Sequence, residues 1–194
     1  MSVYDLIKKN RSYRGYDESY TFTREQLEHF VDGARLTASS VNMQPLKYFI
    51  AYDKADVDTI HPNVFWARNL PKMKLPHEGK KPTGFIVICQ DLSINDRTDR
   101  FLKDVGIVAQ SILLMAVEEG LGGCMIGNFK PTTIQKVLNL PDHLYPLLVV
   151  ALGKPDEEII IKEIEEGEDT KYYRDEQDRH YVPKRKLKDI IIND

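Results

Sequence analysis

Residues 105–127 read VGIVAQSILLMAVEEGLGGCMIG, an apolar helix pattern that stops at glycines and continues into a strand pattern. The part from 105 to 117 has few polar positions on any side, which is typical of a helix in a core or a subunit interface. Gly120 suits the C′ position that ends a helix, and 124–127 then predicts a short strand. We expect the whole helix to span residues 95–119, the longest of the chain.

Helix and strand patterns alternate through the rest of the sequence. Helices are expected at 3–10, at 23–36, in one or two pieces over 55–70, and at 132–138. Strands are expected at 47–52, at 84–90, at 145–152, and as a polar edge strand at 158–164. Thr23 and Gln26 have the spacing of a capping box. After residue 70, Pro71, Pro76, Gly79 and Pro82 predict a loop that could act as a mobile flap.

Length and composition favour one globular domain over residues 1–194, since no Pro/Ser/Gly-rich linker divides the chain. A charged C-terminal arm is expected from about 165 to 194, and 166–179 has so little to bury that alone it would be solvated. Hydrophobic residues make up 42% and charged residues 29%, which argues against disorder and against a membrane protein. Without a signal-peptide pattern, a cytoplasmic protein is expected.

Several classes of function lack their usual sequence marks. The net charge is −3 with no basic stripe, so we expect no nucleic-acid partner. The five histidines lack metal-site spacing, and no metal is expected. Cys89 and Cys124 lie in apolar strand patterns and are expected to be buried free thiols. The common hydrolase and nucleotide-binding motifs do not occur.

A phosphate-binding motif is suggested by Arg11-Ser12-Tyr13-Arg14, directly after the first predicted helix. Guanidinium groups match phosphate oxygens two at a time, and a serine hydroxyl adds a further hydrogen bond. A structural alternative stays open, because cations at a helix C-terminus also favour the helix macrodipole.

Three further stretches carry candidate binding residues. Ser39, Ser40 and Asn42 lie in a polar loop that leads into a strand, although such residues also satisfy local backbone groups. A glycine-rich turn leads to Gly127-Asn128, although it could be only a helix stop. A basic cluster at 182–186 could complete the anion site or be a solvated charged tail.

Taken in order, these stretches resemble the FMN-dependent nitroreductase family. The resemblance is carried by RSYR at 11–14, ASSVNMQP at 38–45, AVEEGLG at 116–122, LP at 140–141 and ALGKP at 151–155. It implies an α+β fold with a mixed, mostly antiparallel sheet flanked by helices. It also implies an intertwined homodimer, with the long apolar helix in the interface and two FMN sites there.

The resemblance implies roles for the phosphate-binding residues. Arg11, Ser12 and Arg14 would hold the FMN phosphate, and Lys184 and Arg185 would join them from the C-terminal segment. Tyr13 would pack rather than bind.

The resemblance also implies residues around the flavin ring. Ser39, Ser40 and Asn42 would approach the isoalloxazine and ribityl groups from the partner subunit. Gly127 and Asn128 would direct backbone N–H groups toward N5 and the adjoining ring edge.

The sequence departs from the family pattern near the expected acceptor pocket. Leu46 stands where many members have an aromatic residue after the proline. The flap region at 66–82 has no family residues that can be carried over to it, and it is where members differ in acceptor. Trp66 and Phe129 are either acceptor-pocket aromatics or core.

The implied activity is that of an oxidoreductase that passes hydride from NADH or NADPH through FMN to a nitroaromatic, quinone or similar small acceptor. One shared site over the flavin would give ping-pong kinetics. Alternatives are an FMN storage or sensing protein without turnover, a relative specialised for flavin or one metabolite, and a ligand-free structural dimer. No catalytic side chain is expected, because the cofactor carries the chemistry.

Overall fold

The computed structural model describes residues 1–193, so Asp194, the last residue of the expected arm, lies outside the described range. The helices are α1 (Val3–Lys9), α2 (Arg24–Arg35), α3 (Lys54–Ile60), α4 (Leu102–Glu118) and α5 (Pro131–Val137), with 3₁₀ turns at Ser40–Asn42, His61–Asn63 and Leu187–Asp189. The strands are β1 (Tyr16–Asp17), β2 (Leu46–Ala51), β3 (Gly84–Asp91), β4 (Gly122–Ile126), β5 (Leu144–Pro155), β6 (Ile159–Ile164), β7 (Tyr173–Arg174) and β8 (His180–Arg185).

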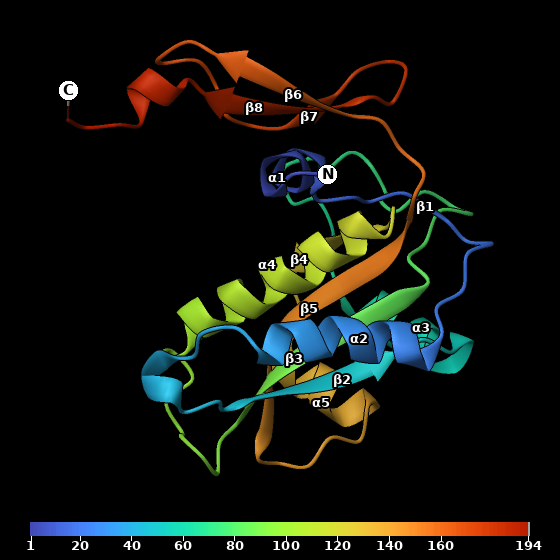
Figure 1. The fold of residues 1–194 in the computed structure, drawn as a ribbon. Helices are drawn as coiled ribbons and strands as arrows, with labels where there is room; N and C mark the ends of the chain where they lie inside the picture. Colours follow the sequence, from blue (N-terminus) through green and yellow to red (C-terminus); the bar gives the residue numbers. More distant parts are fainter. Residues whose placement is uncertain (194) are drawn as a thin grey trace.

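A five-stranded sheet forms the centre of the fold, in the order β1-β5-β3-β2 with β4 also on β5. All of its strand pairs are antiparallel. Alternate side chains of β3 face opposite sides, so Ile86 and Ile88 pack with α2 and α4, while Phe85 and Val87 pack with α3 and α5 (Figure 1). Burial on both faces explains the continuous apolar run of β3. The helices on both faces of the sheet confirm the predicted α+β class.

Helix α4 is the longest helix, but the predicted start at residue 95 is wrong, because the helix begins at Leu102. The side-chain amide of Gln90 donates to the backbone carbonyls of Asn95 (2.6 Å) and Arg97 (3.2 Å), which holds the preceding residues in turns. At the other end Gly120 has a φ of +78°. The N–H groups of Gly120 and Leu121 bond back into the last turn, as in a Schellman motif.

The glycine pair after α4 serves packing as well as the helix stop. A Cβ on Gly123 would lie 2.2 Å from the carbonyl oxygen of Ala151, and one on Gly122 would lie 2.5 Å from the ring of Tyr13. β4 therefore fits between β5 and the segment that follows α1, and Tyr13 N–H donates to Gly123 O at 3.0 Å.

The C-terminal residues form a second sheet of three strands, in which β8 pairs parallel with β6 and antiparallel with β7. This sheet lies across α1, apart from the helices of the main body (Figure 1). Residues 166–179, which alone would be solvated, are partly buried against the rest of the chain, since the side chain of Arg174 is only 2% exposed. It is buried because Glu157, outside the segment, supplies an opposite charge.

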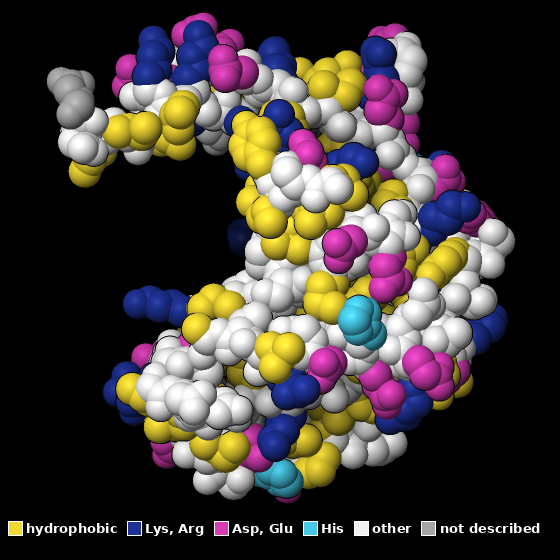
Figure 2. All heavy atoms as spheres, in the orientation of Figure 1, with side chains coloured by type: hydrophobic (Ala, Val, Ile, Leu, Met, Phe, Trp, Pro, Cys, Tyr) yellow, Lys and Arg dark blue, Asp and Glu magenta, His cyan; other side chains and the backbone are white. Residues whose placement is uncertain are grey.

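Apolar side chains remain uncovered on this single chain. No residue of α1 is buried, and its Val3 and Ile7 are 66% and 46% exposed. Hydrophobic side chains also line the underside of the C-terminal arm, beside a deep hollow between the arm and the body (Figure 2). These arm residues are Leu187, Ile190, Ile191 and Ile192.

Candidate functional site

Arg14 is a nearly buried arginine, 8% exposed, at the junction of the main body and the C-terminal sheet. Its guanidinium lies 4.7 Å from the centre of the Tyr172 ring, and Nη1 donates to the carbonyl of Ser12 at 3.1 Å. Neither Nε nor Nη2 of Arg14 has a hydrogen-bond partner among the described residues. The cation is therefore fixed in place with unused donor groups, which suits an anionic ligand.

Arg11 and Ser12 lie beside Arg14 because the chain after α1 runs along β4. Ser12 forms a parallel bridge with Gly123. Arg11 Nη2 donates to the carbonyl of Ile7 at 2.9 Å, its Nε has no partner in the described chain, and burial lowers its pKa. Tyr13 points the other way, and its hydroxyl donates to Lys9 O at 3.1 Å.

A cavity of about 310 Å³ brings these residues together with the C-terminal sheet. Its lining comprises Asn10, Arg11, Ser12, Arg14, Gln110, Leu113, Met125, Tyr172, His180, Val182 and Lys184. Strand alternation explains the contribution of β8, since His180, Val182 and Lys184 share one face. Arg185 belongs to the other face, is exposed, and does not line the cavity.

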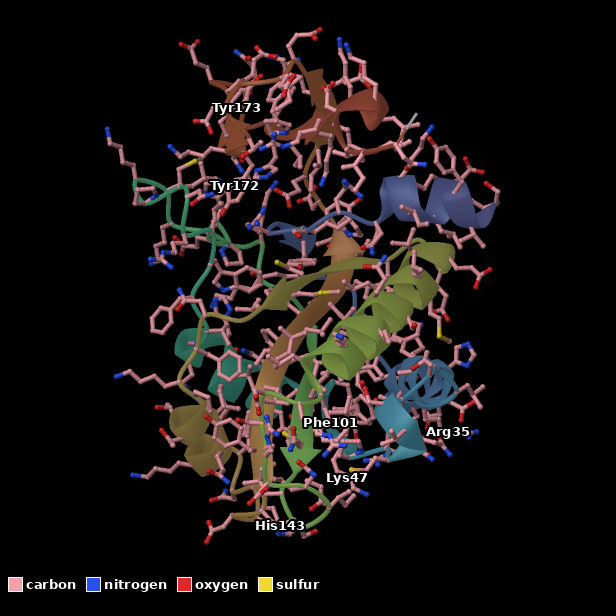
Figure 3. All side chains as sticks on the ribbon, turned by 90° about the vertical axis from the view of Figure 1, so that its left-hand side faces the viewer. Arg35, Lys47, Phe101, His143, Tyr172 and Tyr173 are labelled. Carbon is pink, nitrogen blue, oxygen red and sulfur yellow. The ribbon has the colours of Figure 1, made fainter. Side chains whose placement is uncertain are left out.

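Buried charges behind the cavity hold the C-terminal sheet in position. Arg174 pairs with Glu157, whose side chain is 4% exposed, and its Nη1 lies 2.9 Å from Asp178. Glu157 also accepts the backbone N–H of Arg14, so one carboxylate joins both parts of the site. In Figure 3 Tyr172 lies on the side of this sheet toward the main body, with Tyr173 beyond it.

A second, smaller cavity of about 150 Å³ adjoins the first and shares Arg14 and Met125 with it. Gly127, Asn128 and Trp66 are among its lining residues. The Phe65 N–H donates to Asn128 O at 2.9 Å, which ties the start of the flap to the residues after β4. Trp66 and Phe129 both pack against the core on the α3 and α5 side, and of these two Trp66 also lines this cavity.

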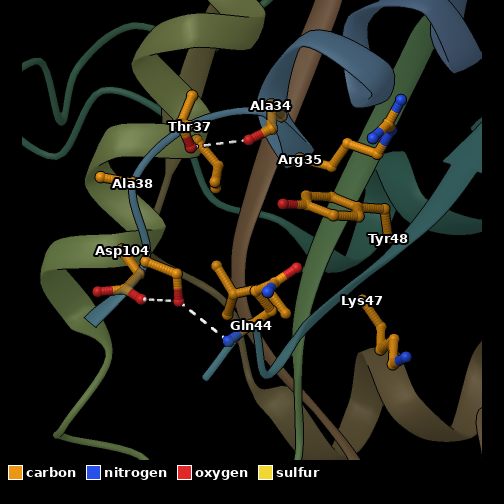
Figure 4. Close-up of a pocket in the computed structure, with 11 residues that line it drawn as sticks. Ala34, Arg35, Thr37, Ala38, Gln44, Lys47, Tyr48 and Asp104 are labelled. Carbon is orange, nitrogen blue, oxygen red and sulfur yellow. Dashed lines mark hydrogen bonds between the residues drawn. The ribbon is translucent and has the colours of Figure 1, made fainter. Parts of the chain in front are cut away.

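The polar loop at 37–45 is held by a different group, the carboxylate of Asp104 in the first turn of α4 (Figure 4). It accepts hydrogen bonds from the Ser39 hydroxyl and the Ser40 N–H, both at 2.8 Å, and from the Ser40 hydroxyl. Burial opposes ionisation of Asp104, but these hydrogen bonds keep its pKa below the usual value. Both serine hydroxyls are thus committed to the protein.

Backbone strain is concentrated in the same loop. Val41, Asn42 and Gln44 have positive φ values of 49°, 53° and 51°. Three such residues in four positions are unusual, and strain of this kind is commonly found at binding sites. Asn42 is exposed, and its side-chain oxygen accepts a hydrogen bond from Gln44 at 3.0 Å.

Within one chain the structure brings together only part of the expected site. Arg11, Ser12, Arg14 and Lys184 line the larger cavity, and Gly127 and Asn128 line the adjoining one. Ser39 lines a separate cavity of about 210 Å³ under the polar loop.

No helix in residues 1–193 combines the length and apolar character needed to cross a bilayer. In that same range no group of His, Cys, Asp and Glu side chains could hold a metal ion. Cys89 and Cys124 are both buried and free, as expected.

The family model described as the nitroreductase family matches residues 7–154, most of the chain. The chain belongs to the nitroreductase family. Among its relatives, a Methanothermobacter thermautotrophicus protein that bears the name NADH dehydrogenase/NAD(P)H nitroreductase is 26% identical over 164 residues, covering 81% of this chain and 79% of that protein. A Bacillus subtilis FMN reductase (NADPH) is 25% identical, covering 78% of this chain and 65% of that protein.

Solved nitroreductase structures share the fold. An FMN-dependent nitroreductase from Clostridium difficile superposes with a TM-score of 0.64 at 25% identity, covering 79% of this chain and 87% of that one. A structure of an Exiguobacterium sibiricum protein in complex with FMN has a TM-score of 0.65 at 19% identity, with 80% and 89% covered.

Tyr172 and His180 complete the larger cavity but were not among the predicted site residues. Tyr172 lies within the highly charged stretch 166–179, and His180 follows that stretch directly. The alternation of His180, Val182 and Lys184 was the available signal, since it places the histidine on the same strand face as the lysine.

Proposed function

We propose that this protein is an FMN-dependent oxidoreductase that takes electrons from NADH or NADPH and passes them to a small acceptor such as a nitroaromatic or a quinone. The observation that carries the proposal is the convergence of two arginines, a serine and a lysine on one cavity, with arginine donor groups left without partners. A phosphate monoester, which carries close to two negative charges at neutral pH, matches that donor set.

Arg11, Ser12, Arg14 and Lys184 would hold the FMN phosphate. The same four residues line the 310 Å³ cavity, and the stacking of Arg14 on Tyr172 fixes the orientation of its guanidinium before the ligand arrives. Arg185 would contribute only long-range charge, because its side chain lies on the outer face of β8.

The flavin ring would extend toward Gly127 and Asn128, since their cavity adjoins the first one and shares Arg14 with it. When bound, FMN supplies the hydride-accepting centre that the side chains of this chain lack. Backbone N–H groups of Gly127 and Asn128 would orient the ring edge, and Trp66 would border the acceptor. A single site shared by donor and acceptor gives ping-pong kinetics.

A homodimer would complete each site with the loop that carries Ser39, Ser40 and Asn42. Support comes from the apolar residues uncovered on α1 and from Leu102 and Ile107 of α4, which are 56% and 40% exposed. The hydroxyls of Ser39 and Ser40 already bond Asp104, so this loop would offer the flavin its backbone and Asn42.

Anaerobic absorption spectroscopy of the FMN-loaded protein tests the proposed function. Addition of NADH or NADPH should rapidly reduce the bound flavin, so that the absorption band of oxidised FMN disappears. A nitroaromatic or quinone added afterwards should restore this band. Bound flavin that neither nicotinamide bleaches would refute the oxidoreductase and favour storage or sensing. Protein that takes up no FMN would refute flavin binding altogether. Mass spectrometry of the flavin after reduction in air would reveal a relative that consumes the flavin itself.

A further inference from the structure

His180 is a buried histidine, 1% exposed, that lines the larger cavity together with Arg14. It is the first residue of β8, and its backbone N–H donates a hydrogen bond to the carbonyl oxygen of Glu158 at 2.9 Å. Only the imidazole is free to act, and burial of such a polar ring requires hydrogen-bond partners.

Both ring nitrogens of His180 face arginines. Nδ1 accepts a hydrogen bond from Arg174 Nε at 3.3 Å, and Nε2 lies 3.3 Å from Arg14 Nη1. Burial and the positive charges of Arg14 and Arg174 lower the pKa of His180 to about 4, so the ring is neutral at physiological pH. A neutral imidazole has one donor and one acceptor, whereas a guanidinium has only donors. In one of the two contacts, the N–H group of the imidazole therefore faces an N–H group of an arginine, and no hydrogen bond can form.

The surroundings of Arg174 decide which contact is mismatched. Arg174 is fixed by Glu157 and by Asp178 at 2.9 Å, and its Nε–H already points at Nδ1. The ring proton then belongs on Nε2, on the side of Arg14 and the cavity. Two donors, Nε2–H and the Arg14 guanidinium, thus border the same space with no acceptor between them among the described residues.

We infer that the Nε2–H of His180 donates a hydrogen bond to the phosphate group held by Arg14, which makes His180 a further cofactor-binding residue. The inference rests on the proposed function, since the phosphate is that of FMN. A phosphate oxygen accepts from both donors at once and removes the mismatch. His180 thereby selects a phosphorylated flavin and adds nothing to the binding of riboflavin, which lacks that group.

The test compares FMN with riboflavin in wild-type protein and in two matched variants, H180Q and H180N. Glutamine places its amide nitrogen near the position of Nε2, so it can still donate into the cavity. Asparagine reaches only the position of Nδ1. Dissociation constants from flavin fluorescence give, for each protein, the ratio of FMN affinity to riboflavin affinity.

We expect this ratio to fall by about ten- to a hundredfold in H180N, the equivalent of one charged hydrogen bond. In H180Q it should stay within about threefold of wild type, and riboflavin affinity should not change in either variant. An unchanged ratio in H180N, or equal losses for FMN and riboflavin, would overturn the role of His180. Wild-type protein that binds FMN no more tightly than riboflavin would instead overturn the proposed phosphate site.

Nitrogen-15 NMR of the wild-type protein tests the same inference without a substitution. We expect a proton on Nε2 of His180, with a resonance that moves when FMN is added and stays in place when riboflavin is added. A proton on Nδ1, or a resonance that FMN does not move, would overturn the inference.

Discussion

Replacement of Asp104 by asparagine tests how the polar loop at 37–45 is held. The carboxylate accepts the Ser39 hydroxyl and the Ser40 N–H, each at 2.8 Å, and also the Ser40 hydroxyl, while it lies in the first turn of α4. Asparagine has nearly the same shape but keeps only one acceptor oxygen and places an NH₂ group where an acceptor is needed.

The magnitude follows from what D104N removes. About one charged hydrogen bond is lost, worth roughly 1.5–3 kcal/mol, together with roughly 0.3–1 kcal/mol from the interaction of the charge with the helix macrodipole. The free energy of unfolding should therefore fall by about 2–4 kcal/mol, which corresponds to a melting temperature lower by about 4–16 °C for a chain of this size. Urea unfolding and calorimetry at fixed protein concentration measure both quantities.

The pH dependence gives a second readout. The pKa of Asp104 is below its usual value in the folded protein, whereas in the unfolded chain an aspartate titrates near about 3.9. The carboxylate thus stabilises the fold fully above the unfolded value, and that contribution is lost as the pH falls through the folded value. Compared with wild type, D104N should have a lower free energy of unfolding at neutral pH, and this free energy should fall less steeply below about pH 4.

Asp142, an exposed aspartate with no side-chain hydrogen bond among the described residues, provides the control D142N. D142N should change stability by less than about 0.5 kcal/mol. Equal stability of D104N and D142N at neutral pH would refute the role of Asp104.

Three further substitutions probe packing, the phosphate site and the dimer. G123A should lower the free energy of unfolding by at least about 1–3 kcal/mol in urea, because the new Cβ would meet the Ala151 carbonyl at 2.2 Å; wild-type stability would contradict the close approach. K184Q should weaken FMN binding about tenfold or more in a fluorescence titration, whereas R185Q should stay within about twofold, and equal losses would contradict the assignment by strand face. I107D should shift the protein toward monomer in sedimentation and weaken FMN binding with it; a stable I107D dimer would exclude this face of α4 from the interface.

Elements with a strong local pattern could be predicted from the sequence. The capping box of Thr23 and Gln26, the apolar strand β3 and the glycine stop after α4 each follow from short-range chemistry, and all three are present. The start of α4 could not be predicted, because it depends on Gln90, a residue on a neighbouring strand that bonds the preceding turn.

The candidate site likewise contains residues that the sequence predicted and residues that it did not. Arginines 11 and 14 were recognisable as an anion motif, and the structure places both on one cavity with Lys184. The contributions of Tyr172 and His180 could not be predicted from their charged neighbourhood. They depend on the buried ion pair of Arg174 and Glu157, which holds the C-terminal sheet against the main body. The two residues of this pair lie far apart in the sequence, so no local pattern indicates the pair.

A crystal structure of the protein saturated with FMN tests the central claim most directly. We expect the FMN phosphate within hydrogen-bonding distance of Arg11, Arg14 and Lys184, with the flavin ring beside Gly127 and Asn128. A phosphate bound anywhere else on the chain, or a larger cavity that stays empty at saturating FMN, would contradict it.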